Sequence, residues 1–325
     1  MESFERSDYD GNIESPQSQR PYSVDVIIPV YHPDGKLHRL LTMLYRQTVK
    51  PAKVLLLHTV EKQGESLPLP EIPGSNITIL PVAKENFDHG GTRKFGASNS
   101  DADILMFMTQ DAVPVDEFLI EKLIVPYWDP LVAATYARQL PGKDADVLER
   151  YMRDFNYPKK SRIKSSEDIG KLGIKTFFCS NVCATYRNET YRKLGGFVEK
   201  TIFNEDMIMA YGIINAGFKI VYTAEAKVLH SHRYSYLQQF TRNFDLGVSH
   251  KQYTGLFGSV KSESEGIKLV KETVKYLAGH KRYLQILELA ISSGFKYLGY
   301  RSGLIYDKLP KNLVVRFSMN KSYWK

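Results

Sequence analysis

Apolar runs alternate with a helical pattern through the first third of the chain. Four short runs rich in Val, Ile, Leu or Met predict buried strands over residues 24–30, 53–59, 77–82 and 103–109. Residues 35–48 place leucines on one helical face, which predicts an amphipathic helix. This alternation predicts an α/β fold with a mostly parallel central sheet covered by helices on both faces.

The second half of the chain has a less regular pattern. The expected elements are a strand over 131–138, charged helical structure over 144–172, a strand or buried turn over 176–187, and a helix over 205–216. Gly217 ends that helix, and two short strands, FKIVYT and AKVLHSH, follow. The first 20 residues are polar and without periodicity, so we expect a flexible tail there.

The positive charge is concentrated at the C-terminal end. The chain has 44 Lys and Arg against 36 Asp and Glu, a net charge of +8. Eleven basic and three acidic residues lie between Val270 and Lys325, so this segment carries the whole surplus. A basic end on a neutral body indicates an anionic surface as its partner.

Within this basic end, residues 283–303 carry an apolar stripe at helical spacing. The stripe consists of Leu284, Leu287, Ile291, Phe295 and Leu298, and it is surrounded by Lys281, Arg282, Lys296 and Arg301. No run in the sequence approaches the ~18 apolar residues of a membrane span. We therefore expect an amphipathic helix that lies on an anionic membrane surface. The alternative is a helix packed on the rest of the chain, with a solvated basic face.

Cysteine use and the N-terminus exclude several protein classes. Cys179 and Cys183 are the only cysteines, so a disulfide scaffold and a four-thiolate zinc site are excluded. They stand in an apolar setting and are expected to be buried small hydrophobes. The N-terminal residues have no apolar core of a secretory signal, and the low cysteine content suits a reducing cytosol.

Polar and charged residues follow several of the predicted strands. Ligands of open α/β sheets bind at the carboxyl ends of the strands, so these positions are the candidate site. The candidates are Pro29, Val30 and Tyr31 after the first strand, His58 at the end of the second, the loop 86–93 after the third, Thr109, Gln110 and Asp111 after the fourth, and His230 and His232 after the last.

The loop at 86–93 has the composition of a phosphate-binding turn. Gly90 and Gly91 allow a close backbone approach, and the helix that follows would present free N–H groups. Arg93 adds a fork for phosphate oxygens. The alternative is a plain turn capped by Asp88.

Asp111, His230 and His232 are candidate metal ligands. A carboxylate just past an apolar strand can hold a divalent cation that bridges two phosphates, although a helix N-cap is the alternative role for Asp111. Two histidines that stand two residues apart in an extended segment face the same way, and imidazole is a common ligand for metals such as manganese.

Glu205 and Asp206 open the helix that is predicted over 205–216. One role for the pair is favourable electrostatics with the helix N-terminus. The other is a general base aimed at an acceptor hydroxyl.

Five segments in this order resemble family 2 glycosyltransferases with the GT-A fold. They are VDVIIPVYHPDGKLHRLLTMLYRQT, NFDHGGTRKFGA, DADILMFMTQDAVP, GGFVEKTIFNEDMIMA and VLHSHRYSYLQQFTRNFDLG. The last four are most similar to bacterial rhamnosyltransferases that use dTDP-L-rhamnose and build cell-surface polysaccharide. The resemblance covers about residues 22–250, and the basic tail is also similar to theirs.

The resemblance implies a division of the chain and its partners. It implies a flexible tail over 1–20, a catalytic domain over 21–250 with a nucleotide-sugar half (21–115) and an acceptor half (116–250), and a helical, basic, amphipathic region over 251–325. It further implies inverting transfer from a nucleotide sugar to a saccharide acceptor, often carried on polyprenyl diphosphate. The cofactor would be a divalent metal, Mg or Mn, and the enzyme would lie in the cytoplasm at the inner face of the membrane.

The resemblance also assigns roles to individual residues. It implies Asp206 as the catalytic base, Asp111 and His230 as metal or diphosphate ligands, with Glu205 and His232 as additional site residues. The implied donor-binding residues are Pro29, Val30, Tyr31, His58, Asp88, Gly90, Gly91, Arg93 and Gln110. Two departures stand out: Thr109 replaces the first aspartate of the Asp-x-Asp metal motif, and His58 stands where many relatives carry an aspartate.

Two further classes of function remain open from the sequence. One is a family 2 enzyme with another donor, such as a galactosyl, glucosyl or N-acetylhexosaminyl nucleotide, which a donor screen would separate. The other is a protein without catalysis, either a scaffold or a nucleic-acid binder. The pI of about 9.1 suggests nucleic acid, but no nucleic-acid motif appears and the charge is confined to one end. We therefore expect no nucleic-acid partner.

Overall fold

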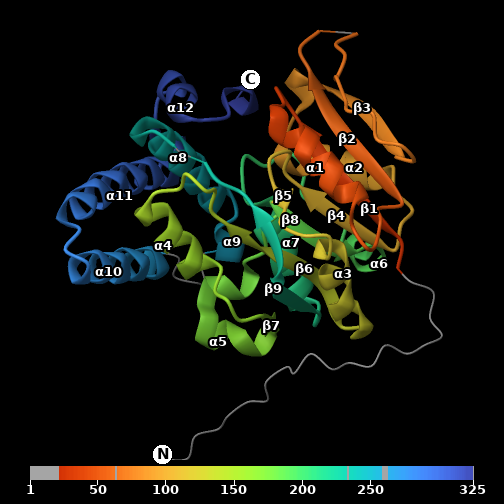
Figure 1. Cartoon of the computed structure of the whole chain (residues 1–325). Helices are drawn as coiled ribbons and strands as arrows, with labels where there is room; N and C mark the ends of the chain where they lie inside the picture. The colour runs from red at the N-terminus through yellow and green to blue at the C-terminus, as the bar shows by residue number, and fades with distance from the viewer. Residues whose placement is uncertain (1–21, 63, 233, 258–262, 325) are drawn as a thin grey trace, which may run out of the picture.

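A computed structural model describes residues 22–62, 64–232, 234–257 and 263–324. The tail predicted over residues 1–20 lies outside the described residues. Nine strands of the described part form one sheet, in the order β3-β2-β1-β4-β8-β6-β9-β5, with β7 paired to β9 at the side. Helices flank this sheet, which confirms the predicted α/β class (Figure 1).

The first half of the sheet is parallel, as predicted. Its elements are β1 (Val24–Val30), α1 (Gly35–Tyr45), β2 (Lys53–Val60), β3 (Ile77–Ala83), α2 (His89–Ser98) and β4 (Ile104–Met108). Strands β3, β2, β1 and β4 pair in parallel. Because side chains alternate along β1, Val26 and Ile28 pack with Leu40 of α1, while Ile27 packs in a second cluster with Ala97 of α2. The two helices therefore cover opposite faces.

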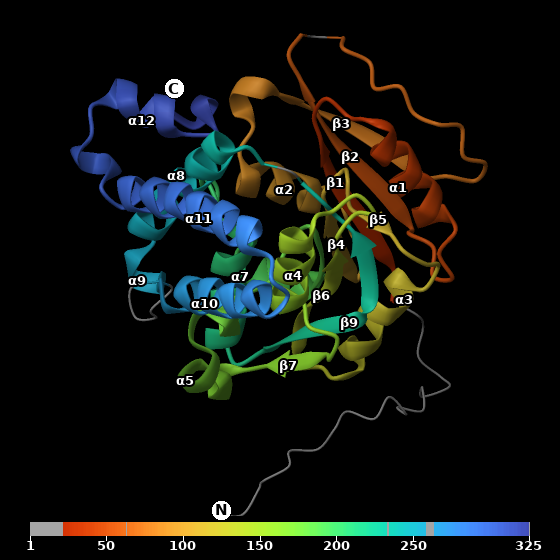
Figure 2. The same cartoon turned by 60° about the vertical axis from the view of Figure 1, so that its left-hand side comes forward.

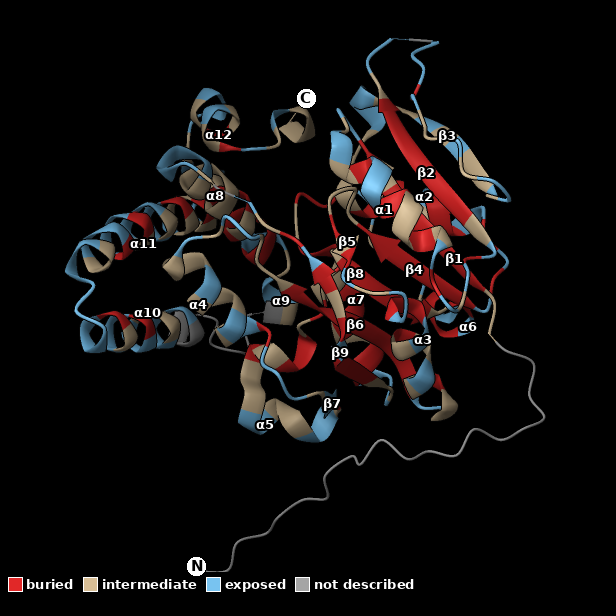
Figure 3. Ribbon diagram, viewed as in Figure 1, coloured by how far each residue is buried: buried red, intermediate tan, exposed pale blue. Residues whose placement is uncertain are grey.

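The second half of the sheet mixes both directions. Its elements are β5 (Val113–Pro114), α3 (Leu119–Ile124), β6 (Val132–Leu140), α4 (Val147–Asn156), β7 (Arg162–Lys164), α5 (Ile169–Leu172), β8 (Cys183–Arg187), α6 (Asn188–Lys193), α7 (Glu205–Asn215) and β9 (Lys219–Leu229). Strand β8 is antiparallel to both β4 and β6, whereas β9 is parallel to β6. Figure 3 shows that the strands of the sheet interior are buried.

Two local predictions differ from the structure, and a third, which left a strand or a buried turn open, is resolved by it. The two short strands expected after Gly217 are one strand, β9, whose register against β6 shifts between Ala137 and Arg138. The expected helical stretch over 144–172 is interrupted by β7, which pairs with β9. Residues 176–187 divide into the end of a 3₁₀ turn (Gly173–Phe177) and strand β8. Cys179 and Cys183 are buried free thiols, as predicted.

Helices make up the C-terminal region, as predicted. They are α8 (Tyr236–Gln252), α9 (Thr254–Phe257), α10 (Glu263–Gly279), α11 (Tyr283–Leu304) and α12 (Lys311–Phe317). Helix α8 runs across the predicted boundary at residue 250 and packs along α11 (Figure 2). The division of the chain into domains stays a prediction.

Glycines allow α8 and α11 to approach closely. A Cβ at Gly303 would lie 2.1 Å from the carbonyl oxygen of Phe244, and one at Gly299 would lie 2.2 Å from that of Phe240. Both distances are far shorter than a van der Waals contact, so only glycine fits at these positions without moving a backbone. The outer face of α11 does not take part in this contact.

We expect Gly303→Ala to destabilise the protein by about 1–3 kcal/mol, because the added methyl group must push α11 away from α8. The matched control is Gly294→Ala in the same helix, where a Cβ meets nothing within 4 Å. That variant should be neutral or more stable by up to about 1 kcal/mol, since alanine favours helix. Urea unfolding of the two variants gives the comparison, and equal midpoints would contradict the close-packing account.

Candidate active site

The candidate site lies where β1, β2, β4 and β9 end. Strand β4 ends at Met108 and β9 ends at Leu229, so Asp111 and His230 come directly after buried strands. Val113 pairs with Leu229 in the sheet, and Leu140 pairs with the same residue from the other side. The end of β9 therefore lies between the segment that carries Asp111 and the end of β6.

Asp111, His230 and His232 form one cluster, in agreement with their predicted positions. Their ligand atoms all lie within 4.8 Å of one another. Oδ2 of Asp111 is 2.9 Å from Nε2 of His232 and 3.7 Å from Nε2 of His230. Burial alone would raise the pKa of Asp111, but the hydrogen bond from His232 helps to hold it below its ordinary value. The cluster thus offers an ionised carboxylate and two imidazoles, a donor set that fits a divalent transition metal.

Gln139, at the end of β6, orients His230. Its Oε1 lies 3.0 Å from Nδ1 of His230 and also accepts a hydrogen bond from Arg153. Because an amide oxygen has no proton to give, Nδ1 must carry the proton of this contact. Burial lowers the pKa of His230 to about 3, so the ring is neutral and its Nε2 keeps a lone pair on the side of Asp111. Sequence reasoning missed Gln139 and Arg153.

Glu205 and Asp206 occupy the first turn of α7, as predicted, and Asn181 holds both. The Nδ2 of Asn181 donates to Glu205 (3.2 Å), and its backbone N–H donates to Oδ2 of Asp206 (3.2 Å). Burial, and next to it the charge of Glu205, raises the pKa of Asp206 to about 7. A carboxylate with such a pKa has the property of a general base at neutral pH.

Hydrogen bonds connect the acidic pair to the metal cluster. Nε2 of Gln139 donates to Oγ of Ser180 (3.0 Å), which precedes Asn181 in the chain. Gln139 therefore contacts His230 through its oxygen and the segment that holds Asp206 through its nitrogen. The metal cluster and the acidic pair therefore belong to one site.

The glycine-rich turn differs from its prediction. Asp88 is the N-cap of α2, and its Oδ1 accepts from the N–H groups of both Gly90 (3.0 Å) and Gly91 (2.8 Å). The N–H groups of Gly90 and Gly91, which were expected to be free, are therefore already bonded to Asp88, as in the alternative of a capped turn. A Cβ at Gly90 would lie 1.8 Å from the carbonyl oxygen of Val198, so this glycine is needed for packing.

Arg93 is also placed differently from the expectation of an open phosphate fork. Its guanidinium is buried and lies 3.3 Å from Glu205, and its NH1 donates to the carbonyl of His89 (2.9 Å). Burial would raise the pKa of Glu205, but the charge of Arg93, together with His89 and the hydrogen bond from Asn181, holds the pKa below its ordinary value. Arg93 thus helps to keep Glu205 ionised beside Asp206. A role of Asp88, Gly90, Gly91 or Arg93 in donor binding stays a prediction.

The other predicted donor-binding residues lie together at the end of β1. The side-chain amide of Gln110 forms two hydrogen bonds with the backbone of Tyr31, at 2.9 and 3.0 Å. Val30 pairs with His58, which is buried in β2. Next to them, the hydroxyl of Tyr31 donates to Glu61 (2.5 Å), and Lys84 donates to Glu61 (2.7 Å). Sequence reasoning missed Glu61 and Lys84, although each directly follows a strand.

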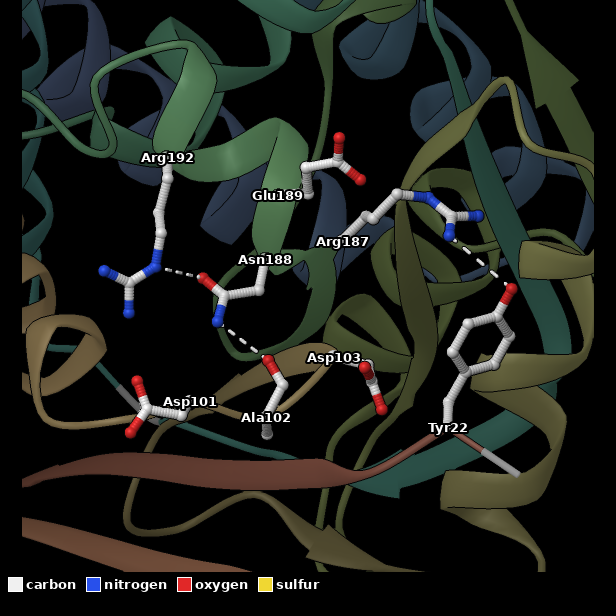
Figure 4. Close-up of a pocket in the computed structure, with 8 residues that line it drawn as sticks. All are labelled: Tyr22, Asp101, Ala102, Asp103, Arg187, Asn188, Glu189 and Arg192. Carbon is white, nitrogen blue, oxygen red and sulfur yellow. Dashed lines mark hydrogen bonds between the residues drawn. The ribbon is translucent and has the colours of Figure 1, made fainter. Parts of the chain in front are cut away.

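A separate pocket lies at the opposite edge of the sheet (Figure 4). Tyr22 precedes β1, Asp101 and Asp103 precede β4, and Arg187 ends the antiparallel strand β8. The pocket is thus at the amino ends of β1 and β4, whereas the metal cluster and Asp206 lie beyond their carboxyl ends. We therefore do not assign this pocket to the candidate site.

Comparison with known proteins gives the family. Residues 25–195 match the sequence model of Glycosyl transferase family 2. The chain is 40% identical to the O-antigen chain rhamnosyltransferase RfbN of Salmonella typhimurium, over 93% of this chain and 96% of that protein. It is 36% identical to the O-antigen chain rhamnosyltransferase WbaN of Salmonella anatum, with the same coverage.

Solved structures agree on the fold. The mannosyltransferase PcManGT of Pyrobaculum calidifontis, in complex with GDP-Man and Mn²⁺, superposes with a TM-score of 0.54 at 13% identity, over 94% of this chain and 85% of that one. Residues 1–349 of S. aureus TarS give a TM-score of 0.53 at 11% identity, over 91% and 83%. The chain is a glycosyltransferase with the GT-A fold, and it belongs to glycosyl transferase family 2.

Proposed function

We propose that this enzyme transfers L-rhamnose from dTDP-L-rhamnose, with inversion, to a saccharide acceptor carried on polyprenyl diphosphate. The identity to RfbN over nearly the whole of both chains supports rhamnose as the sugar and polysaccharide synthesis as the role. The observation that carries the reaction type is Asp206, a carboxylate held by two backbone N–H groups with a pKa near neutrality.

The residues of the site divide the chemistry between them. Asp206 removes the proton of the acceptor hydroxyl, whose oxygen forms the new bond to the anomeric carbon from the face opposite the diphosphate. The bond from that carbon to the diphosphate oxygen breaks, and its electron pair stays on the diphosphate. Burial and the charge of Glu205 keep the pKa of Asp206 raised, while Asn181 fixes the direction of its carboxylate.

Asp111, His230 and His232 are the proposed ligands of a divalent metal. The fit rests on the convergence of their ligand atoms and on Gln139, which leaves Nε2 of His230 unprotonated. When bound, Mn or Mg supplies positive charge to the leaving diphosphate. Two imidazoles in the set favour Mn over Mg, which prefers oxygen ligands.

With purified enzyme, Mn²⁺ and an acceptor, we expect dTDP-L-rhamnose to release dTDP faster than any other nucleotide sugar in a panel releases its own nucleoside diphosphate. Asp111→Asn should abolish the release, because it removes the only carboxylate of the cluster. Asp101→Asn, at the other end of β4, is the control and should keep wild-type rates. A faster rate with another sugar nucleotide would refute the proposed donor.

The second prediction concerns the base. The activity kcat/KM should rise as the pH rises through about 7, because only the deprotonated form of Asp206 accepts a proton. Asp206→Asn should lower kcat by about 10²- to 10⁴-fold and remove this pH dependence, while donor affinity stays. If donor affinity falls and turnover holds, Asp206 is a binding residue.

We also propose that the C-terminal helices bind the cytoplasmic face of an anionic membrane. On α11, Leu284, Leu287 and Leu298 are 82%, 60% and 59% exposed, so the predicted stripe faces outward. The opposite face of the same helix packs on α8 through Gly299 and Gly303. Helix α11 therefore packs on the rest of the chain with one face and leaves its apolar stripe exposed on another. No helix of the described residues is long and apolar enough to cross a membrane.

Replacement of Leu284, Leu287 and Leu298 by Ser should weaken binding to vesicles that contain anionic lipid, because about 0.8 kcal/mol is lost for each CH₂ that no longer inserts. The matched control replaces Ile79, Leu131 and Ile163, three exposed apolar residues of the catalytic region, by Ser. Vesicle sedimentation compares the two triple variants. An equal loss of vesicle binding in both triple variants, or no loss of binding in either, would contradict the membrane role of the stripe.

A further inference from the structure

Arg242 lies near the metal cluster and forms no ion pair within 4.0 Å with a carboxylate of the described residues, although its charge acts on the more distant Asp245. It lies on α8, ten residues after His232, and is half-buried. Among the described residues, its guanidinium has no hydrogen-bond acceptor and no carboxylate within 4.0 Å, in contrast to Arg93, which is paired with Glu205. Burying part of a charge without a partner costs free energy, so such a group is suited to an anionic ligand.

Two aromatic rings hold this guanidinium in place. Its central carbon lies 4.7 Å from the ring centre of Phe203 and 5.7 Å from that of Tyr234. These cation–π contacts restrain the side chain while they leave its N–H groups open for in-plane hydrogen bonds. Arg242 is thus positioned without being neutralised.

The same two rings locate Arg242 between the two parts of the site. Tyr234 stacks on the metal-cluster residue His232, with ring centres 5.4 Å apart. Phe203 stands two residues before Glu205 and contacts His89. The positive charge of Arg242 contributes to the lowered pKa values of both His89 and His230, after the larger effect of burial. Arg242 therefore lies close to the metal cluster and to the acidic pair.

A second arginine lies beside Nδ1 of His230. NH1 of Arg153, on α4, donates to Gln139, and its NH2 lies 3.4 Å from Nδ1 of His230. Since that Nδ1 already carries a proton for Gln139, NH2 of Arg153 is left without an acceptor there. No carboxylate of the described residues lies within 4.0 Å of this guanidinium. Two arginines from different helices thus lie near the cluster, and neither forms an ion pair with a carboxylate of the described residues.

We propose that Arg242, with Arg153 as a second arm, binds the diphosphate of the nucleotide-sugar donor and of the nucleoside diphosphate product. This inference rests on the proposed function, and it assigns phosphate contacts to side chains for which the sequence predicted none. A diphosphate has several anionic oxygens, enough for a metal ion and two guanidinium groups. The diphosphate of a lipid-linked acceptor has the same chemistry. The donor is favoured because Tyr234, which holds Arg242, stacks on His232 of the metal cluster.

Titration calorimetry with dTDP and Mn²⁺ tests this inference apart from catalysis. We expect Arg242→Met to weaken dTDP binding by about 10- to 100-fold, the usual loss for a charge-assisted hydrogen bond, and Arg242→Lys to weaken it less. Lys251→Met on the same helix is the matched control, because Lys251 pairs with Asp307 (3.8 Å) at the far end of α8. It should bind dTDP like the wild type.

Two further readouts separate the alternatives. Thermal unfolding shows whether Arg242→Met is folded, and Arg242→Gln replaces it if it is not. Wild-type affinity for dTDP in the folded variant would overturn the inference, and a higher KM only for the polyprenyl-diphosphate acceptor would then assign Arg242 to the acceptor. If the wild-type protein binds none of dTDP, UDP and GDP with Mn²⁺, the proposed function fails together with this inference.

Discussion

The register of β9 is the constraint on which the site depends. Leu229 pairs with Val113 of β5 on one side and with Leu140 of β6 on the other. This pairing brings His230 next to Gln139 and Asp111, although these residues are about 90 and 120 positions away in the sequence. A shift of one residue would turn the side chain of His230 to the other face of the sheet and remove a ligand from the cluster. In the structure, the irregularity between Ala137 and Arg138 of β6 sets the register in which the end of β9 pairs.

The buried charges of the site are arranged so that two carboxylates stay ionised while the third, Asp206, can hold a proton. Asp111 is held ionised beside two imidazoles, and Glu205 is held ionised by Arg93. Among the described residues no cation lies within 4.0 Å of the Asp206 carboxylate, and burial together with the charge of Glu205 disfavours its ionised form. Titratable neighbours whose pKa values are driven apart are a common arrangement for acid–base chemistry. Here the arrangement gives Asp206 the proton and leaves Asp111 free to bind a cation.

Sequence reasoning predicted the elements and the strand ends well, because both follow from local patterns. Buried strands gave continuous apolar runs, and residues that follow them, Asp111 and His230, do meet at one edge of the sheet. Long-range partners were not visible in this way. Nothing near Arg93 in the sequence indicates that Glu205, more than a hundred residues later, neutralises it. Gln139 and Asn181 act through one or two hydrogen bonds that only the fold creates. Strand β7 was missed because its three residues are too few for a pattern.

The most direct test of this account is a crystal structure with Mn²⁺ and dTDP, measured at the manganese absorption edge. The account predicts one anomalous peak within coordination distance of Asp111, His230 and His232, with Nδ1 of His230 still on Gln139. A peak that lies away from these three side chains, or no peak at saturating Mn²⁺ with dTDP bound, would contradict it.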